Sequence, residues 1–137
     1  MIIIVAVDDR NGIMFNGRRQ SQDRALRQRI LDLTVSSRLW INHYTQKQFA
    51  ETNAPQLNID EDFLSEAAPG EYCFIENVSV APYEKWVEKI ILFKWNRKYP
   101  GDFYFDIDVK GKEWHLASTE DFQGSSHDKI TMEVYTR

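Results

Sequence analysis

Cysteine and histidine are scarce in this chain, which argues against disulfide bonds, metal sites and cysteine catalysis. Cys73 is the only cysteine among 137 residues, so no intramolecular disulfide can form. Disulfides are typical of exported proteins, and a lone cysteine within the apolar stretch YCFI is typical of a small buried side chain. The three histidines, His43, His115 and His127, lack the clustered His and Asp spacing of a zinc site. We therefore expect no metal site and no catalytic cysteine.

Long hydrophobic runs and an excess of basic charge are missing as well. No stretch approaches the ~20 apolar residues that a membrane span needs. The opening MIIIVAV lacks the basic flank of a signal peptide and runs directly into charged residues. The chain has 17 basic and 21 acidic residues, a net charge of −4, which argues against binding to phosphate backbones. We expect a cytoplasmic protein without membrane or nucleic-acid partners, although Trp95 to Tyr99, in KWNRKY, has the composition of a nucleic-acid contact.

Apolar strand patterns alternate with helical ones along the first two thirds of the chain. Ile2–Val7, Tyr72–Ile75 and Lys89–Trp95 are strongly apolar runs, typical of strands buried on both faces of a sheet. We expect these three strands to be parallel neighbours. Apolar residues at helical spacing predict a helix over Arg24–Thr34, with Ser21 as its N-cap.

Shorter patterns complete an α/β domain over residues 1–137. No apolar strand is expected between Phe49 and Glu71. The further elements predicted are a strand at Arg38–Ile41, helices at Thr45–Ala50, Asp60–Ala67 and Pro82 to about Val87, and antiparallel strands at Phe103–Phe105, Glu113–Ser118 and Lys129–Tyr135. The pattern predicts a three-layer α/β sandwich, with a mostly parallel sheet and an antiparallel C-terminal edge.

The order of several segments resembles dihydrofolate reductase over almost the whole chain. IIIVAVDDRNGI resembles that family's first strand and the start of its mobile substrate loop, and WINHYT resembles a strand-to-helix turn that usually reads I-M-G-R-x-T. EYCFIEN resembles the strand before the family's paired glycines, and SSHDKITMEVYTR resembles part of its last third. The resemblance implies a dihydrofolate reductase-like fold, with Asp23 at the substrate carboxylate and Thr45 at the threonine of the turn.

The chain departs from that family where the family binds its substrate and nucleotide. Arg18, Arg19 and Gln20 stand in the neighbourhood of a Pro-Trp pair. Asn42-His43 replaces Gly-Arg, and Glu76-Asn77 replaces the paired glycines. A carboxylate at position 76 would repel a pyrophosphate by several kcal/mol at ~4 Å, for an effective dielectric constant near 20. Together with the missing adenosine-side strand, these changes predict that no nicotinamide cofactor binds.

Polar residues after the apolar strands are the candidate site. We expect Asp23 to point into a cleft, with Glu76 or Asn77 opposite and Arg18 and Arg19 over its mouth. The candidates are Asp23 and Glu76 for acid/base catalysis and Arg18, Arg19, Gln20, Gln22, Asn42, His43, Thr45 and Asn77 for ligand binding. Some of these have a structural alternative. Asp23 can serve the helix dipole or pair with Arg27, Arg18 and Arg19 can be solvated or pair with Asp8 and Asp9, and Asn42 or Thr45 can cap a helix.

Three functions stay open on this basis. The first is a small-molecule protein for a nitrogen heterocycle or an anion, either a binding protein or an enzyme independent of nicotinamide. The second is a divergent NADPH-dependent reductase. The third is an RNA-acting hydrolase, because RRQSQD and YCFIEN also resemble small bacterial proteins labelled ribonuclease Z. The metal motif of such an enzyme is absent from this sequence.

Overall fold

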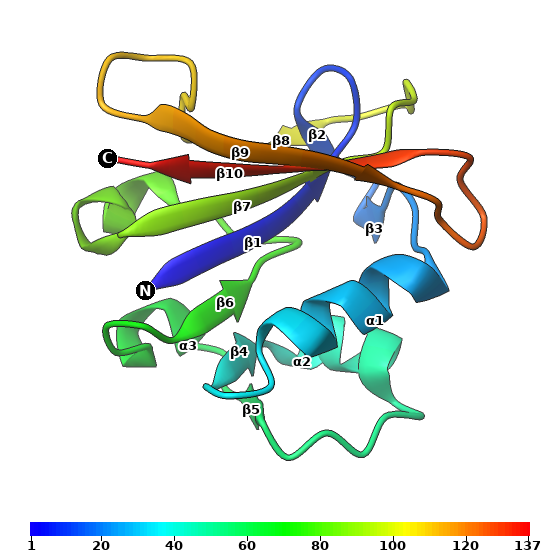
Figure 1. Cartoon of the computed structure of the whole chain (residues 1–137). Coiled ribbons are helices and arrows are strands. Elements are labelled where there is room, and N and C mark those ends of the chain that lie inside the picture. The colour runs from blue at the N-terminus through cyan, green and yellow to red at the C-terminus, as the bar shows by residue number, and fades with distance from the viewer.

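Five parallel strands form the main part of a seven-stranded sheet in the computed structural model, which describes residues 1–137 (Figure 1). The strand order is β5-β4-β6-β1-β7-β10-β9. The parallel strands are β5 (Leu57–Ile59), β4 (Leu39–Ile41), β6 (Tyr72–Phe74), β1 (Ile2–Val7) and β7 (Lys89–Lys94). The expectation that the three apolar runs are parallel neighbours is confirmed, because β1 lies between β6 and β7.

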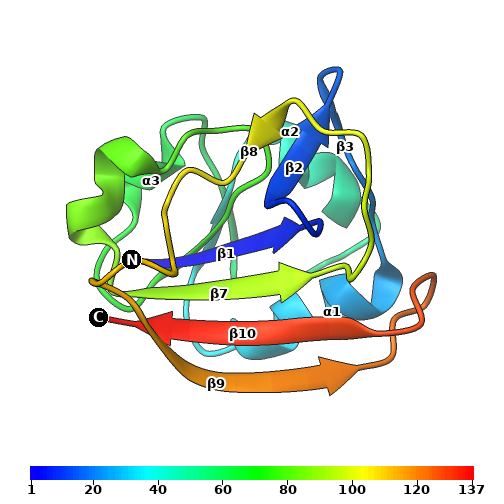
Figure 2. The same ribbon diagram turned by 90° about the horizontal axis from the view of Figure 1, so that it is seen from above.

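The sheet ends in the expected antiparallel edge. Strand β10 (Ile130–Thr136) pairs antiparallel with β7 on one side and with β9 (His115–Phe122) on the other. Figure 2 shows β10 pointing opposite to both neighbours. The loop between β9 and β10 therefore reaches the same edge of the sheet as the carboxyl end of β7. That position matters for the site.

Both faces of the central sheet are covered, which explains the apolar run at the start of the chain. Ile3 and Val5 of β1 pack into one buried cluster, whereas Ile2 and Ile4 pack into another. Successive side chains of a strand point to opposite faces, so an apolar residue is needed at every position. Helix α1 (Arg24–Leu33) covers the second face and contributes its two buried residues, Leu26 and Ile30.

The remaining helices are short, and two of the three predicted segments are wholly or partly 3-10 helix. Helix α2 (His43–Gln46) continues into a 3-10 turn at Lys47–Phe49, and α3 covers only Phe63–Glu66. The segment that begins at Pro82 is part of a 3-10 helix, Ala81–Trp86. No helix of the structure is long and apolar enough to cross a membrane.

Two strands beside the main sheet, β2 and β3, were not predicted, and a third strand was expected in the wrong sheet. The segment between β1 and α1 contains a hairpin of β2 (Gly12–Phe15) and β3 (Arg18–Arg19), joined by Asn16 and Gly17, which both have positive φ. Asn-Gly suits such a hairpin turn. Strand β8 (Phe103–Tyr104) pairs with β2 in this small second sheet instead of extending the antiparallel edge.

Strand β5 corrects the expectation that no strand lies between positions 49 and 71. It has only three residues, with Asn58 between Leu57 and Ile59, and it pairs with β4 at the outer edge of the sheet. Edge strands are short and partly exposed, so they lack the continuous apolar pattern of a central strand. One of the two arguments against a nucleotide site is therefore wrong.

Candidate functional site

The carboxyl ends of β1, β6 and β7 meet around a small cavity beside α1. Its volume is about 20 Å³, enough for about one water molecule. Ligands of open α/β sheets bind at this edge. The apolar lining comes from Ala6, Ile13, Leu26, Phe74, Ile75 and Trp95, and the polar lining from Arg19, Ser21, Gln48 and Glu76.

The carboxylate of Glu76 is held at this cavity by the guanidinium of Arg19. The Arg19 Nε to Glu76 Oε2 distance is 2.8 Å and the Nη2 to Oε1 distance is 3.2 Å, so the pair is bidentate. Thr45 Oγ1 and Gln48 Nε2 also donate to the carboxylate, at 2.9 and 2.7 Å. The Arg19 guanidinium carbon lies 4.5 Å from the centre of the Tyr44 ring. Burial lowers the pKa of Arg19, but the hydrogen bond and charge of Glu76 outweigh this and raise it.

This ion pair weakens the expected repulsion between Glu76 and the pyrophosphate of a nucleotide. Repulsion of a pyrophosphate was expected from an unpaired carboxylate at position 76. Glu76 is buried and paired, and its Arg19 partner is one-fifth exposed. The pair is close to neutral, so long-range repulsion by Glu76 is not a sound reason to exclude phosphate. If Glu76 and Asn77 stand where the resembling family has paired glycines, their side chains still hinder the approach of a pyrophosphate to the backbone.

Asp23 does not line the cavity, which corrects the expectation that it points into a cleft. It is the N-cap of α1, accepting the Leu26 N–H at 3.1 Å, a role expected for Ser21. The β9–β10 loop holds the rest of the carboxylate: Ser125 N–H at 3.0 Å, Ser126 N–H at 2.8 Å, the Ser126 hydroxyl at 3.1 Å and His127 Nδ1 at 2.9 Å. Burial raises the pKa of Asp23, but these hydrogen bonds outweigh it and hold the pKa well below its usual range.

Ser21 takes part in this network instead of capping the helix. Its Oγ lies 3.0 Å from His127 Nε2, and the Tyr99 hydroxyl lies 3.0 Å from the same nitrogen. The indole of Trp95 stacks on the imidazole, with ring centres 4.4 Å apart and planes 24° apart. A chain of contacts therefore links Asp23 to the cavity through His127 and Ser21.

The other candidates from the β3 region serve the scaffold or face solvent. Arg18 is exposed, so only Arg19 reaches the cavity. Gln20 donates to Asp8 Oδ2 at 3.3 Å and to the Pro100 carbonyl at 3.1 Å, which ties β3 to the loop after β7. Gln22 is exposed.

The candidates around α2 divide in the same way. Asn42 caps α2 by accepting the Thr45 N–H at 3.1 Å, and its amide donates to Asn77 Oδ1 at 2.8 Å. His43 is exposed and pairs with Glu61 at 2.9 Å. Of this group only Thr45 contacts the buried carboxylate of Glu76. The structural alternative is therefore correct for Asn42.

His127, Tyr99 and Trp95 belong to the network around Asp23, although the sequence patterns did not place them there. His127 was judged only for metal-ligand spacing, and the useful signal was SSH directly before the last strand. Trp95 and Tyr99 were considered for nucleic-acid contact, but Trp95 is buried and the Tyr99 hydroxyl faces His127. Their rings are thus not an open stacking surface for bases.

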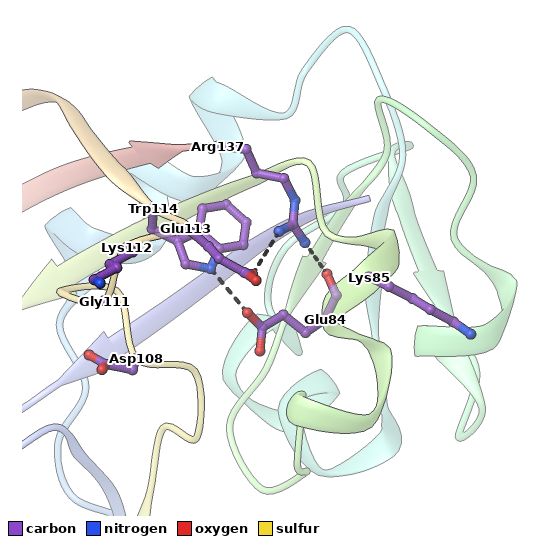
Figure 3. Close-up of a pocket in the computed structure, with 8 residues that line it drawn as sticks. All are labelled: Glu84, Lys85, Asp108, Gly111, Lys112, Glu113, Trp114 and Arg137. Atoms are coloured by element: carbon purple, nitrogen blue, oxygen red, sulfur yellow. Dashed lines mark hydrogen bonds and ion pairs between the residues drawn. The ribbon is translucent and has the colours of Figure 1, made fainter.

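A wider and more open hollow, about 660 Å³, lies elsewhere on the molecule (Figure 3). The Trp114 indole N–H donates to Glu84 at 3.2 Å, and Arg137 pairs with Glu113 at 3.3 Å and covers the Trp114 ring at 4.4 Å. These side chains satisfy one another within the hollow. It lies apart from the residues considered above, and it brings together no buried acid, base or nucleophile.

Comparison with solved structures identifies the fold. A dihydrofolate reductase from Enterococcus faecalis, complexed with NADP(H) and RAB-propyl, matches with a TM-score of 0.67 and 15% identity. The match covers 100% of this chain and 96% of the other. The chain has a dihydrofolate reductase-like fold. No family model and no curated protein matches the sequence, so the resemblance to proteins labelled ribonuclease Z gains no support. No three His, Cys, Asp or Glu residues are placed to hold a metal ion.

Proposed function

We propose that this dihydrofolate reductase-like protein binds a small planar cation at the carboxylate of Glu76. Suitable ligands are amidines, guanidines and protonated nitrogen heterocycles. The observation that carries the proposal is the bidentate Arg19–Glu76 pair, in which the chain itself places a planar cation on a buried carboxylate. A ligand with two N–H groups on one edge makes the same two charge-assisted hydrogen bonds.

The surroundings of the pair also suit a flat cation. The Tyr44 ring covers the guanidinium, and a ligand in its place would receive the same cation–π contact. Thr45 and Gln48 hold Glu76 in position independently of Arg19. The carboxylate therefore stays oriented when its cationic partner is exchanged.

Binding requires Arg19 to leave, because the cavity of about 20 Å³ is too small for a heterocycle while the guanidinium is in place. Arg19 belongs to the two-residue strand β3, and its side chain is one-fifth exposed. Rotation of this side chain into solvent frees the carboxylate without disturbing the main sheet. The cost of that rotation lowers the apparent affinity of the unmodified protein.

Calorimetric titration with 2,4-diaminopyrimidine and with benzamidine tests the proposal. Arg19→Ala should bind at least one probe about tenfold more tightly than the unmodified protein, because the competing guanidinium is gone. The double variant Arg19→Ala/Glu76→Gln should lose this binding. Arg18→Ala is the matched control, since Arg18 is exposed, and it should leave the affinity unchanged. A folded Arg19→Ala protein that binds neither probe would overturn the proposal.

The second candidate is a divergent NADPH-dependent reductase. The solved dihydrofolate reductase with the same fold holds NADP(H), and β5 supplies an outer strand that the sequence analysis took to be missing. Against it stand the side chains of Glu76 and Asn77, where the family has glycines. Direct titration with NADPH separates the two candidates.

A further inference from the structure

Ser21, His127 and Asp23 have the geometry of a nucleophile, a base and an orienting carboxylate. The Ser21 Oγ to His127 Nε2 distance is 3.0 Å, and the His127 Nδ1 to Asp23 Oδ2 distance is 2.9 Å. The ionised Asp23 carboxylate can only accept, so the shared proton is on Nδ1 of the imidazole. In this tautomer Nε2 presents its lone pair towards Ser21, as general-base catalysis requires.

This arrangement is held rigidly. The side chains of His127 and Asp23 are 2% and 0% exposed, and the Trp95 indole stacks on the imidazole. Two backbone N–H groups of the β9–β10 loop and one of α1 fix the carboxylate. Neither partner of Ser21 has to move before it can act.

Ser21 also has access to an acyl group, because it is one of the residues that line the cavity. It is partly exposed, unlike its two partners. The backbone N–H groups of Ser21 and Gln22 donate to no acceptor in the chain. Free N–H groups next to a nucleophile can stabilise the oxyanion of a tetrahedral intermediate.

We infer that Ser21 is the nucleophile of an acyl-transfer site that hydrolyses esters of small acyl groups. Ser21 Oγ bonds to the carbonyl carbon while its proton passes to His127 Nε2. As the ester C–O bond breaks, that proton passes to the departing alcohol. Water then attacks the acyl-serine by the same route and releases the acid. His127 is the general base, and Asp23 is a positioning residue.

The small cavity sets the class of ester. With a volume of about 20 Å³ and mostly apolar walls, it admits no more than the methyl of an acetyl group and excludes a long chain. The alcohol part of the ester then lies towards solvent. We therefore expect acetyl esters to react faster than octanoyl esters of the same alcohol.

Replacement of Tyr99 distinguishes an acyl-transfer site from a network that only stabilises the fold. Its hydroxyl is 3.0 Å from His127 Nε2 and 3.5 Å from Ser21 Oγ, so it competes with Ser21 for the lone pair of the imidazole. In a network that only stabilises the fold, Ser21→Ala and Tyr99→Phe are equivalent losses of one hydroxyl. In an acyl-transfer site only Ser21→Ala removes ester cleavage, whereas Tyr99→Phe leaves it unchanged or increases it.

Ser21, Arg19 and Glu76 line the same cavity, but neither Glu76 nor Arg19 transfers a proton or bonds to the acyl group, so the acyl-transfer site can be tested separately from the cation site. The cation site is measured by calorimetry with 2,4-diaminopyrimidine. The acyl-transfer site is measured by covalent modification of Ser21. If one of the two experiments gives a negative result, the other experiment still tests its own proposal.

Incubation with p-nitrophenyl acetate, followed by peptide mass spectrometry and release of p-nitrophenol, is the test. We expect acetylation at Ser21 and a fall in turnover on the order of 100-fold or more in Ser21→Ala and His127→Gln. Tyr99→Phe should retain or increase turnover. The matched controls are Ser118→Ala and His115→Gln, which change exposed residues of β9 and should match the unmodified protein.

Equal turnover in Ser21→Ala and the unmodified protein would overturn the inference, as would acetylation at lysines alone. If His127→Gln fails to fold, the pair Ser21→Ala and Tyr99→Phe still decides the question. Both change a partly exposed hydroxyl, and circular dichroism verifies that each is folded.

Discussion

Two of the buried carboxylates near the carboxyl edge of the sheet, Asp23 and Glu76, are held by different kinds of donor. Asp23 is fixed largely by backbone N–H groups of α1 and of the β9–β10 loop. Glu76 is fixed by the side chains of Arg19, Thr45 and Gln48. Backbone donors can leave only if the loop moves, whereas a side chain can leave by rotation. Asp23 is therefore suited to orient a partner permanently, and Glu76 is suited to exchange one.

The largest expected effect is on stability, at Asp23. Asp23→Asn removes the charge and places an amide donor among the donors that now meet the carboxylate. We expect a loss of about 3 kcal/mol in the free energy of unfolding, measured by urea denaturation. Asp32→Asn, an exposed change in the same helix, is the control and should alter stability by less than about 0.5 kcal/mol. A loss at Asp23 no larger than at Asp32 would mean that the network contributes little to stability.

Replacement of Glu76 should lower the free energy of unfolding by less than replacement of Asp23. Glu76→Gln keeps the shape of the side chain, and Arg19 can turn to solvent, so we expect a loss of about 1–2 kcal/mol. The double variant Arg19→Ala/Glu76→Gln should be less destabilised than the sum of the single changes, because the two residues share one interaction. A loss equal to that of Asp23→Asn would contradict the view that the Glu76 partner is exchangeable.

Acid should destabilise the unmodified protein by protonating Asp23. A carboxylate whose pKa is depressed by folding contributes stability above its ordinary pKa of about 3.9, and this contribution fades as the pH falls through the folded value. The difference in unfolding free energy between the unmodified protein and Asp23→Asn should therefore be constant from pH 7 to 5 and decrease below about pH 4. Denaturation curves at a series of pH values measure it, and a constant difference down to pH 2 would contradict the depressed pKa.

The smallest expected effect is on nucleotide binding. Since side chains stand in place of the paired glycines, NADPH should bind no more tightly than ~1 mM, which corresponds to about −4 kcal/mol. Calorimetric titration measures this directly. Micromolar affinity would favour the reductase and would show that the backbone near Glu76 still accommodates a pyrophosphate.

Local patterns in the sequence determined the frame of the fold. The runs in β1, β6 and β7 are apolar at nearly every position because the central strands are buried on both faces, and α1 carries an apolar stripe because it packs on one of them. The short elements were misjudged for the opposite reason. In β5 and in the β2–β3 hairpin, too few residues are buried to leave a pattern.

Arg19, Glu76 and Thr45 were among the candidates from the sequence, and the structure brings these three side chains into contact. Only the tertiary structure decided which of them meet. Asp23 and His127 are 104 positions apart, and Arg19 and Glu76 are 57 apart. No local periodicity encodes such pairings. They depend on the strand order, which places the β9–β10 loop at the carboxyl end of β7. The hydrogen bonds that hold Asp23, and the contact between Ser21 and His127, form only when the β9–β10 loop lies against the start of α1.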